Sequence, residues 1–213
     1  MHRLNIEHLV LGPIGTNTYF ASDPQTGECV VIDPASSPGM IKKKLDEDRL
    51  TVRAILLTHG HFDHMMAVNE LRTAYGIPVY AHSAEAAMLA EPSAGLMNID
   101  LSGKAVTDYN EVHDGDVLEL IGYKWKVMHT PGHSAGSVCY YIEEEKVIFS
   151  GDTLFRCTYG RTDLPTGSYA EMVSSLKNKL FMIPDDDISV FPGHGDPTTL
   201  GFEKNHNDIL MDS

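Results

Sequence analysis

The stretch Thr58-His59-Gly60-His61-Phe62-Asp63-His64 carries the strongest structural signal in the chain. Four side chains that can bind a metal lie within six residues, directly after the apolar run 54–57. That run predicts a buried strand, and Gly60 lets the backbone turn tightly behind it. Imidazole and carboxylate groups are ligands that Zn²⁺ and Fe²⁺ accept. The stretch therefore predicts a metal site at the end of a core strand.

The spacing within this stretch divides its ligands into two pairs. His59 and His61 lie two positions apart, so both can point to the same side of an extended turn. Asp63 and His64 come at the predicted start of a helix, where they can turn towards a second ion. The alternative is a surface loop that happens to hold several histidines. It is disfavoured because crowded polar groups lose hydration and repel one another without a cation.

Three later segments repeat the pattern of a ligand directly after a predicted strand. Each ligand is flanked by Gly or Pro, and loops held by a rigid sheet are where binding groups belong. Any one of these segments alone would indicate only a turn. The segments are Thr130-Pro131-Gly132-His133, Ser150-Gly151-Asp152-Thr153 and Phe191-Pro192-Gly193-His194-Gly195.

The chain alternates short strand-like runs with amphipathic helical segments, which is typical of two sheets packed face to face with helices outside. We expect an α+β, αββα four-layer sandwich with two mixed sheets, forming one domain over residues 1–213. Predicted helices follow Pro38 and cover 65–75, 83–89, 169–180 and 201–208. Predicted strands cover 9–11, 18–21, 29–32, 54–57, 78–81, 117–121, 124–128, 137–142, 146–149 and 188–191.

The composition narrows the class of partner. The formal net charge of −14 repels phosphate backbones, which disfavours nucleic acid and leaves a small-molecule substrate. The apolar runs are too short to span a bilayer, and the N-terminus shows no secretion signal. Three widely spaced cysteines favour a reducing, cytoplasmic setting. We expect a monomer or a small homo-oligomer that does not bind membranes.

Taken together, these motifs resemble the ligand signature of metallo-β-lactamase-fold hydrolases. The resemblance covers nearly the whole chain, and its spacing is most similar to short, single-domain relatives of glyoxalase II, the hydroxyacylglutathione hydrolases. It is carried by the ligand segments above and by Gly15-Thr16-Asn17-Thr18-Tyr19, Val31-Ile32-Asp33-Pro34, Gly151-Asp152-Thr153-Leu154-Phe155 and Gly160-Arg161-Thr162-Asp163.

The resemblance implies two divalent metal ions, zinc first, with iron or manganese as other choices. The first ion would be held by His59, His61 and His133, and the second by Asp63, His64 and His194, with Asp152 bridging the pair. It implies hydrolysis by a hydroxide shared between the ions. Asp63 would be the catalytic residue that orients this hydroxide and accepts a proton.

The resemblance also implies a substrate, a thiolester such as S-lactoylglutathione. Arg161 would bind a substrate carboxylate, although a structural pair with Asp163 is an equal alternative. Two departures weaken the match to glutathione. The chain ends soon after His206, where longer relatives continue into a helical domain, and Thr162 replaces the aromatic residue that those relatives place after the basic one.

Other activities of the same family remain as alternatives. A mononuclear iron persulfide dioxygenase would use His59, His133 and Asp152, and such enzymes share the segment Gly160–Asp163. A lactonase or β-lactamase-type hydrolase is a further alternative, which would release no thiol. For His129, which is near His133 in the sequence, two interpretations stay open: a residue near the site that a backbone group orients, or a surface or packing residue. We expect Cys157 to be a buried, inert thiol.

Overall fold

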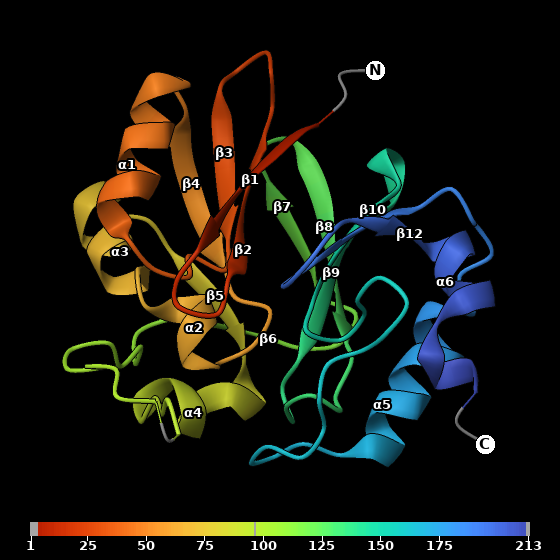
Figure 1. Ribbon diagram of the computed structural model, residues 1–213. Helices are drawn as coiled ribbons and strands as arrows, with labels where there is room; N and C mark the ends of the chain where they lie inside the picture. The colour runs from red at the N-terminus through yellow and green to blue at the C-terminus, as the bar shows by residue number, and fades with distance from the viewer. Residues whose placement is uncertain (1–3, 96, 212–213) are drawn as a thin grey trace.

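The computed structural model describes residues 4–95 and 97–211 and arranges them in four layers (Figure 1). Two six-stranded sheets face each other in the middle. Helices α1 (Pro38–Glu47) and α3 (Val68–Tyr75) cover the outer face of one sheet. Helices α5 (Tyr169–Ser175) and α6 (Leu200–His206) cover the other. The predicted αββα sandwich is confirmed.

The first sheet has the strand order β1-β2-β3-β4-β5-β6. The first three strands pair antiparallel, and a turn over 23–27 joins β2 to β3. From β3 to β6 the pairing is parallel. The strands are β1 Asn5–Leu11, β2 Thr16–Ser22, β3 Glu28–Ile32, β4 Thr51–Leu56, β5 Val79–His82 and β6 Asn110–Val112.

The second sheet has the order β12-β11-β10-β9-β8-β7, and only β10 and β11 pair in parallel. Strand β9 runs against both of its neighbours, so β8, β10 and β11 point the same way and end at one edge. The strands are β7 Val117–Leu120, β8 Tyr123–His129, β9 Val138–Ile142, β10 Val147–Gly151, β11 Ser189–Pro192 and β12 Thr198–Thr199.

The prediction of one continuous helix over 65–75 is wrong. The structure has a short helix α2 (Phe62–Met65), then a break, and then α3. At the break, the Ala67 amide donates to the carbonyl oxygen of Pro34 (3.0 Å), a residue of another loop. A tertiary hydrogen bond therefore replaces a helical one, which local periodicity cannot reveal.

Smaller differences concern the other helices and the edge strands. The predicted helix 83–89 begins as a 3₁₀ turn, Ser83–Glu85, before α4 (Ala86–Ala90), and the helix that contains α5 ends in a π-helical turn, Leu176–Leu180. Strands β6 and β12 were not predicted, because they are too short to show alternation. Within the described residues, no helix has the length and apolarity needed to cross a membrane.

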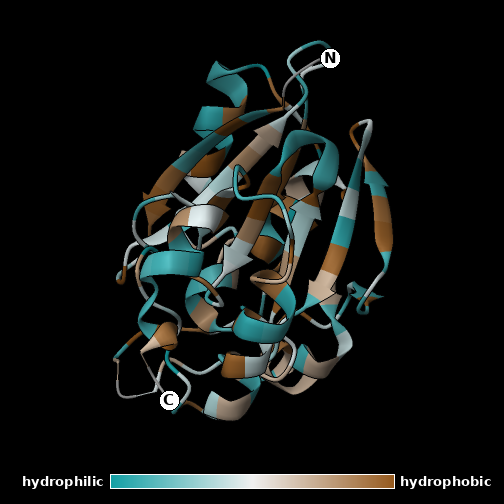
Figure 2. Cartoon of the chain, turned by 90° about the vertical axis from the view of Figure 1, so that its right-hand side faces the viewer, coloured by the Kyte–Doolittle hydropathy of each residue, from teal (hydrophilic) through white to brown (hydrophobic). Residues whose placement is uncertain are grey.

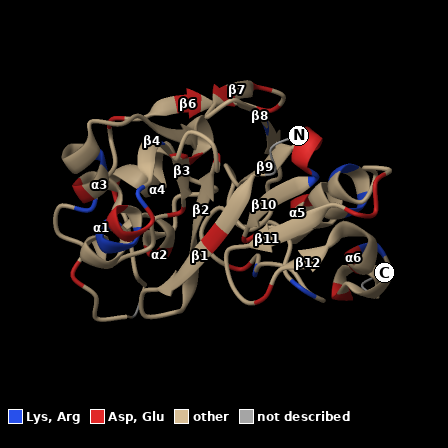
Figure 3. Ribbon diagram, turned by 90° about the horizontal axis from the view of Figure 1, so that it is seen from above, with Lys and Arg blue, Asp and Glu red and all other residues tan. Residues whose placement is uncertain are grey.

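Three apolar layers hold the four structural layers together. Between the sheets, Trp125, Tyr140 and Phe149 are almost completely buried. Beneath α1, Ile41 and Leu45 are buried against the first sheet. Figure 2 shows apolar residues along the strands, and Figure 3 shows charged residues mostly on the helices and connecting loops. Burial of this apolar surface is the main force that fixes the strand ends relative to one another.

Candidate metal centre

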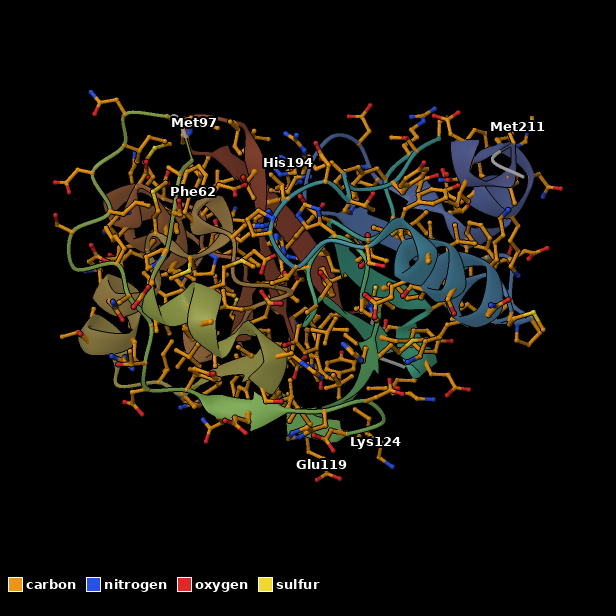
Figure 4. All side chains as sticks on the ribbon, turned by 90° about the horizontal axis from the view of Figure 1, so that it is seen from below. Phe62, Met97, Glu119, Lys124, His194 and Met211 are labelled. Atoms are coloured by element: carbon orange, nitrogen blue, oxygen red, sulfur yellow. The ribbon has the colours of Figure 1, made fainter. Side chains whose placement is uncertain are left out.

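The ligands predicted from the sequence converge at one edge of the sandwich, between the two sheets. His59 and His61 follow β4, Asp63 and His64 lie in α2, His133 follows β8, Asp152 follows β10 and His194 follows β11. Figure 4 labels His194, which lies between the two halves of the molecule. Each half therefore contributes part of the cluster.

Backbone hydrogen bonds join the loops that carry these side chains. The Asn17 amide donates to the Gly193 carbonyl (2.7 Å), and the Gly193 amide donates to the Gly151 carbonyl (2.8 Å). The Val138 amide donates to the Thr58 carbonyl (2.9 Å). The bonds from Asn17 and Val138 cross from one sheet to the other, and the bond from Gly193 joins the ends of β11 and β10. Together they give the loops a defined separation.

Gly193 is required by a close approach of side chains. A Cβ atom at this position would collide with Oδ1 of Asp152 and lie 2.7 Å from Cε1 of His64. The motif Pro192-Gly193-His194 therefore does more than form a turn. It leaves room for a carboxylate and an imidazole from two other segments.

One part of the cluster consists of three imidazoles. The ring centroids of His59, His61 and His133 lie 4.6–4.9 Å apart. Nδ1 of His61 lies 2.8 Å from Nε2 of His133. These three side chains can offer nitrogen atoms within 4.8 Å of one another, a spacing suited to one metal ion.

The other part combines carboxylates with imidazoles. Nε2 of His64 lies 3.3 Å from Asp63 Oδ2 and 3.4 Å from Asp152 Oδ1. Nε2 of His194 lies 3.4 Å from Asp63 Oδ2 and 3.5 Å from Asp152 Oδ2. Asp152 also reaches the three-imidazole part, because its Oδ2 lies 3.4 Å from Nε2 of His133. Asp152 thus stands between the two parts, and the arrangement has the geometry of a binuclear metal site.

Four of the five imidazoles have Nδ1 within reach of an acceptor outside the cluster. The acceptors are Thr58 Oγ1 for His59 (3.0 Å), Asp33 Oδ2 for His64 (2.9 Å), and the carbonyls of Arg161 and Gly15 for His133 (2.8 Å) and His194 (3.3 Å). An Nδ1–H that donates outwards leaves the Nε2 lone pair free to face a metal.

The donor atoms that face inwards fit a metal ion. Nε2 of His59, Nε2 of His64 and Oδ1 of Asp152 are buried and have no hydrogen-bond partner among the described residues. Leaving such a group unpaired costs about 1–3 kcal/mol. Unpaired lone-pair donors on three side chains of the cluster are therefore explained best by cations bound between them.

Burial controls the protonation of the three-imidazole part. Burial and the neighbouring histidines lower the pKa of His61 to about 4 and hold the pKa of His59 well below its usual value. Both imidazoles are therefore neutral at pH 7 and have a free lone pair to offer.

The carboxylates reverse this effect in the second part. Burial alone would lower the pKa of His64, but Asp63, Asp152 and Asp33 raise it well above its usual value. The pKa of His194 rises to about 9 through hydrogen bonds to Asp152 and Asp63, against the effect of burial. The same contacts hold the pKa of Asp63 and Asp152 below the usual range, although burial opposes this. Without a metal, protons supply the positive charge that these carboxylates require.

Two residues that support the site were not assigned a role from the sequence. Asp33 accepts from the Thr58 amide (2.8 Å), the Thr58 hydroxyl (2.6 Å) and His64 Nδ1, while only 2% of its surface is exposed. Thr16 donates its hydroxyl to Asp63 Oδ2 (2.7 Å). A carboxylate directly after a buried strand, as in Ile32-Asp33-Pro34, is the signal that could have identified the first.

Three further sequence expectations have different outcomes. The exposed guanidinium of Arg161 forms a two-pronged pair with Asp163 (both contacts 2.7 Å), so the structural alternative is present in the structure. Nε2 of His129 donates to the Ala135 carbonyl (2.8 Å), which confirms a backbone partner. The expectation of a buried Cys157 is wrong, because this residue is exposed in a left-handed turn (φ +66°) of the loop after Asp152.

Comparisons with known proteins agree with this architecture. The model of the metallo-beta-lactamase superfamily matches residues 11–194. Hydroxyacylglutathione hydrolase GloC of Haemophilus influenzae is 33% identical, with 97% of this chain and 98% of that protein covered. The crystal structure of the B3 metallo-beta-lactamase BLEG-1 has a TM-score of 0.87 and 38% identity, covering 97% and 99%. That of TTHA1623 in a di-iron-bound form has a TM-score of 0.83 and 34% identity, covering 96% and 100%.

Proposed function

Because the chain belongs to the metallo-beta-lactamase superfamily, we propose that it is a metal-dependent hydrolase that cleaves a thiolester of the S-lactoylglutathione type. The observation that carries this proposal is the convergence of five imidazoles and two carboxylates, in which three buried atoms lack partners among the described residues: Nε2 of His59, Nε2 of His64 and Oδ1 of Asp152. The similarity to a hydroxyacylglutathione hydrolase over nearly the whole chain supports the choice of substrate.

The residues divide between two metal positions. His59, His61 and His133 would hold the first ion, Asp63, His64 and His194 would hold the second, and Asp152 would bridge them. Two divalent ions supply Lewis acidity and lower the pKa of water when they are bound. Zinc suits imidazole and carboxylate donors, and the similarity to a protein crystallised with two irons makes iron the other choice.

Asp63 is the residue best placed to orient the attacking water. Its Oδ2 accepts the Thr16 hydroxyl, which fixes the rotation of the carboxylate. Its lowered pKa keeps it ionised at neutral pH, so it can accept a hydrogen bond from a water molecule held in the cluster. The carboxylate then directs a lone pair of that water towards a bound acyl group.

A thiolester suits a site of this kind. A thiolate leaving group has a parent pKa near 8.5 and departs with little help from a general acid. Arg161 lies in the loop after Asp152, and its backbone carbonyl accepts from His133. Its exposed guanidinium could exchange Asp163 for a substrate carboxylate, which would place an anionic thiol conjugate beside the site.

The direct test is thiol release from S-lactoylglutathione by protein loaded with zinc or with iron. We expect turnover that is lost on treatment with a chelator and restored by adding back the metal. Asp187→Ala is the control for substitutions at the site. It removes a carboxylate that is 87% exposed and pairs only loosely with Lys146 (3.8 Å). Absence of metal-dependent turnover on a panel of thiolesters would defeat the proposal.

A second candidate is β-lactam hydrolysis, favoured by the 38% identity to a B3 metallo-beta-lactamase. Opening a β-lactam ring releases no thiol, so loss of β-lactam absorbance without activity on thiolesters would support this candidate. Oxygen uptake with glutathione persulfide would instead indicate the iron dioxygenase expected as an alternative from the segment Gly160–Asp163.

A further inference from the structure

Glu85 is a buried carboxylate that joins two loops of the metal centre. Only 1% of its surface is exposed. Oε2 accepts from the Gly60 amide (2.7 Å), and Oε1 accepts from the Gly136 amide (2.6 Å). Gly60 lies between His59 and His61, and Gly136 lies three residues after His133. One side chain therefore connects the two loops that supply the three imidazoles.

Both amide donors belong to glycines, and the packing explains why. A Cβ at Gly136 would lie 2.7 Å from both Cγ and Oε1 of Glu85, and a Cβ at Gly60 would lie 2.9 Å from Oε2. A side chain at either position would push the carboxylate away from the amides. The two glycines and the glutamate thus form one complementary contact.

The 3₁₀ turn Ser83–Glu85, which carries Glu85, is held in place by other contacts. The side chain of His82 accepts from the Ala84 amide (3.2 Å) and stacks on His129, with ring centroids 4.2 Å apart. The other end of His129 donates to the Ala135 carbonyl, next to Gly136. A second set of contacts, through His82 and His129, therefore also holds the end of β5 against the loop after β8.

Burying a carboxylate is costly unless it is paired and hydrogen-bonded. No Lys or Arg forms an ion pair with Glu85 in the part of the chain that the structure describes. An apolar side chain could fill this space at a lower cost, so packing alone gives no reason for a carboxylate here. The bond pattern supplies a reason, because only a two-oxygen acceptor can satisfy one amide from each loop.

We propose that Glu85 is a positioning residue that sets the separation of the His59–His61 loop from the His133 loop, and so determines the affinity of the first metal position. The inference rests on the proposed metal-binding function. Among the described residues, the side-chain hydrogen bonds of Glu85 run to the two glycine amides and to no ligand side chain, so it acts through these amides. The second position has its own support from Asp33 and Thr16, so it is independent of Glu85.

The test uses Glu85→Gln and Glu85→Ala with titration of Co²⁺ or Zn²⁺ against a competing chelator. In Glu85→Gln, the side-chain NH₂ group would face the backbone N–H of Gly60 or Gly136, and only one acceptor oxygen would remain. In Glu85→Ala, both backbone N–H groups would lose their acceptor. We expect the first metal equivalent to bind roughly 10- to 100-fold more weakly, with the larger loss in Glu85→Ala. The affinity of the other equivalent should stay unchanged.

Glu203→Gln is the matched control for a general loss of stability. Glu203 is also fully buried, and it accepts from the Cys157 amide, the Thr198 hydroxyl and the Asn207 side chain. It makes none of these contacts with a loop of the three-imidazole group. We expect this control to lower the unfolding temperature without changing the ratio of the two metal affinities.

A second background identifies the affected position. In the His61→Ala variant, metal binding at the first position is already weakened. Adding Glu85→Gln to this variant should therefore leave the affinity of the metal at the second position unchanged. The visible Co²⁺ spectrum of the remaining equivalent should also be the same in both. Equal weakening of both equivalents by Glu85→Gln, or of neither, would overturn the inference. A wild-type protein that binds no metal would overturn the proposed function as well, so the two failures are distinguishable.

Discussion

Asp33→Asn is the change that tests most sharply how the second metal position is built. Asp33 accepts three hydrogen bonds through two oxygens, from the amide and hydroxyl of Thr58 and from Nδ1 of His64. Asparagine has almost the same shape but only one acceptor oxygen. The substitution therefore changes the hydrogen-bond pattern while conserving the packing volume.

Both orientations of the new amide are unfavourable. If its oxygen faces the Thr58 amide, its NH₂ group faces Nδ1 of His64, which must then accept, and the proton moves to Nε2. That nitrogen points at Asp63 and Asp152 and could no longer offer a lone pair to a metal. If the amide is flipped, two N–H groups face each other in a buried position.

The size of the effect follows from the bond that is lost. A hydrogen bond to a charged group is worth about 1.5–3 kcal/mol. Such a loss corresponds to roughly 10- to 100-fold weaker binding of the second metal, which matches the usual effect of removing an outer partner of a histidine ligand. In a chain of this length, it also lowers the unfolding temperature of the metal-free protein by about 3–12 °C.

Chelator competition and thermal unfolding measure these two quantities. Asp187→Asn is the control, because the same substitution at an 87% exposed side chain should change neither. If Asp33→Asn bound both metals with wild-type affinity, the argument that Asp33 selects the protonation state of His64 would be refuted.

Three other predictions concern the site. Asp152→Ala should lower the metal content and abolish activity while circular dichroism stays close to that of Asp187→Ala; full activity would show that the bridging assignment is wrong. The pKa of His194 is raised from 6.5 to about 9, so its contribution to the stability of metal-free protein is complete below pH 6.5 and is lost as the pH rises to 9. The unfolding temperature of chelator-treated protein should fall over that window, and His194→Gln should reduce the fall; an identical fall in both would contradict the assignment. Arg161→Ala should raise KM for S-lactoylglutathione by no more than roughly tenfold with kcat unchanged, because the guanidinium is exposed; Asp163→Ala, which frees that guanidinium, should not raise KM.

The break between α2 and α3 shows where local patterns stop being informative. Apolar residues continue through Met65 and Met66 at helical spacing, and nothing nearby indicates an end. The break depends on the Pro34 carbonyl, which the fold brings to the Ala67 amide. A residue more than thirty positions away therefore decides a helix boundary, and no window of sequence includes both partners.

Most strands and helices and the seven ligand candidates were accessible from the sequence alone; strands β6 and β12 and the break between α2 and α3 were not. They depend on local features: apolar runs of strand length, Gly and Pro behind each run, and donor side chains directly after it. Asp152 and His194 could be selected in this way because Asp152 follows β10 directly and only Gly193 separates His194 from β11.

Only the tertiary structure decided how these residues meet and which others hold them. Three features join segments distant in the sequence: the alignment of the ends of β8, β10 and β11 along one edge, the hydrogen bond from His64 to Asp33, and the bridge that Glu85 makes between two loops. Their physical cause is non-local: burial of the apolar layers brings the strand ends together, and buried polar groups then require partners wherever the fold supplies them.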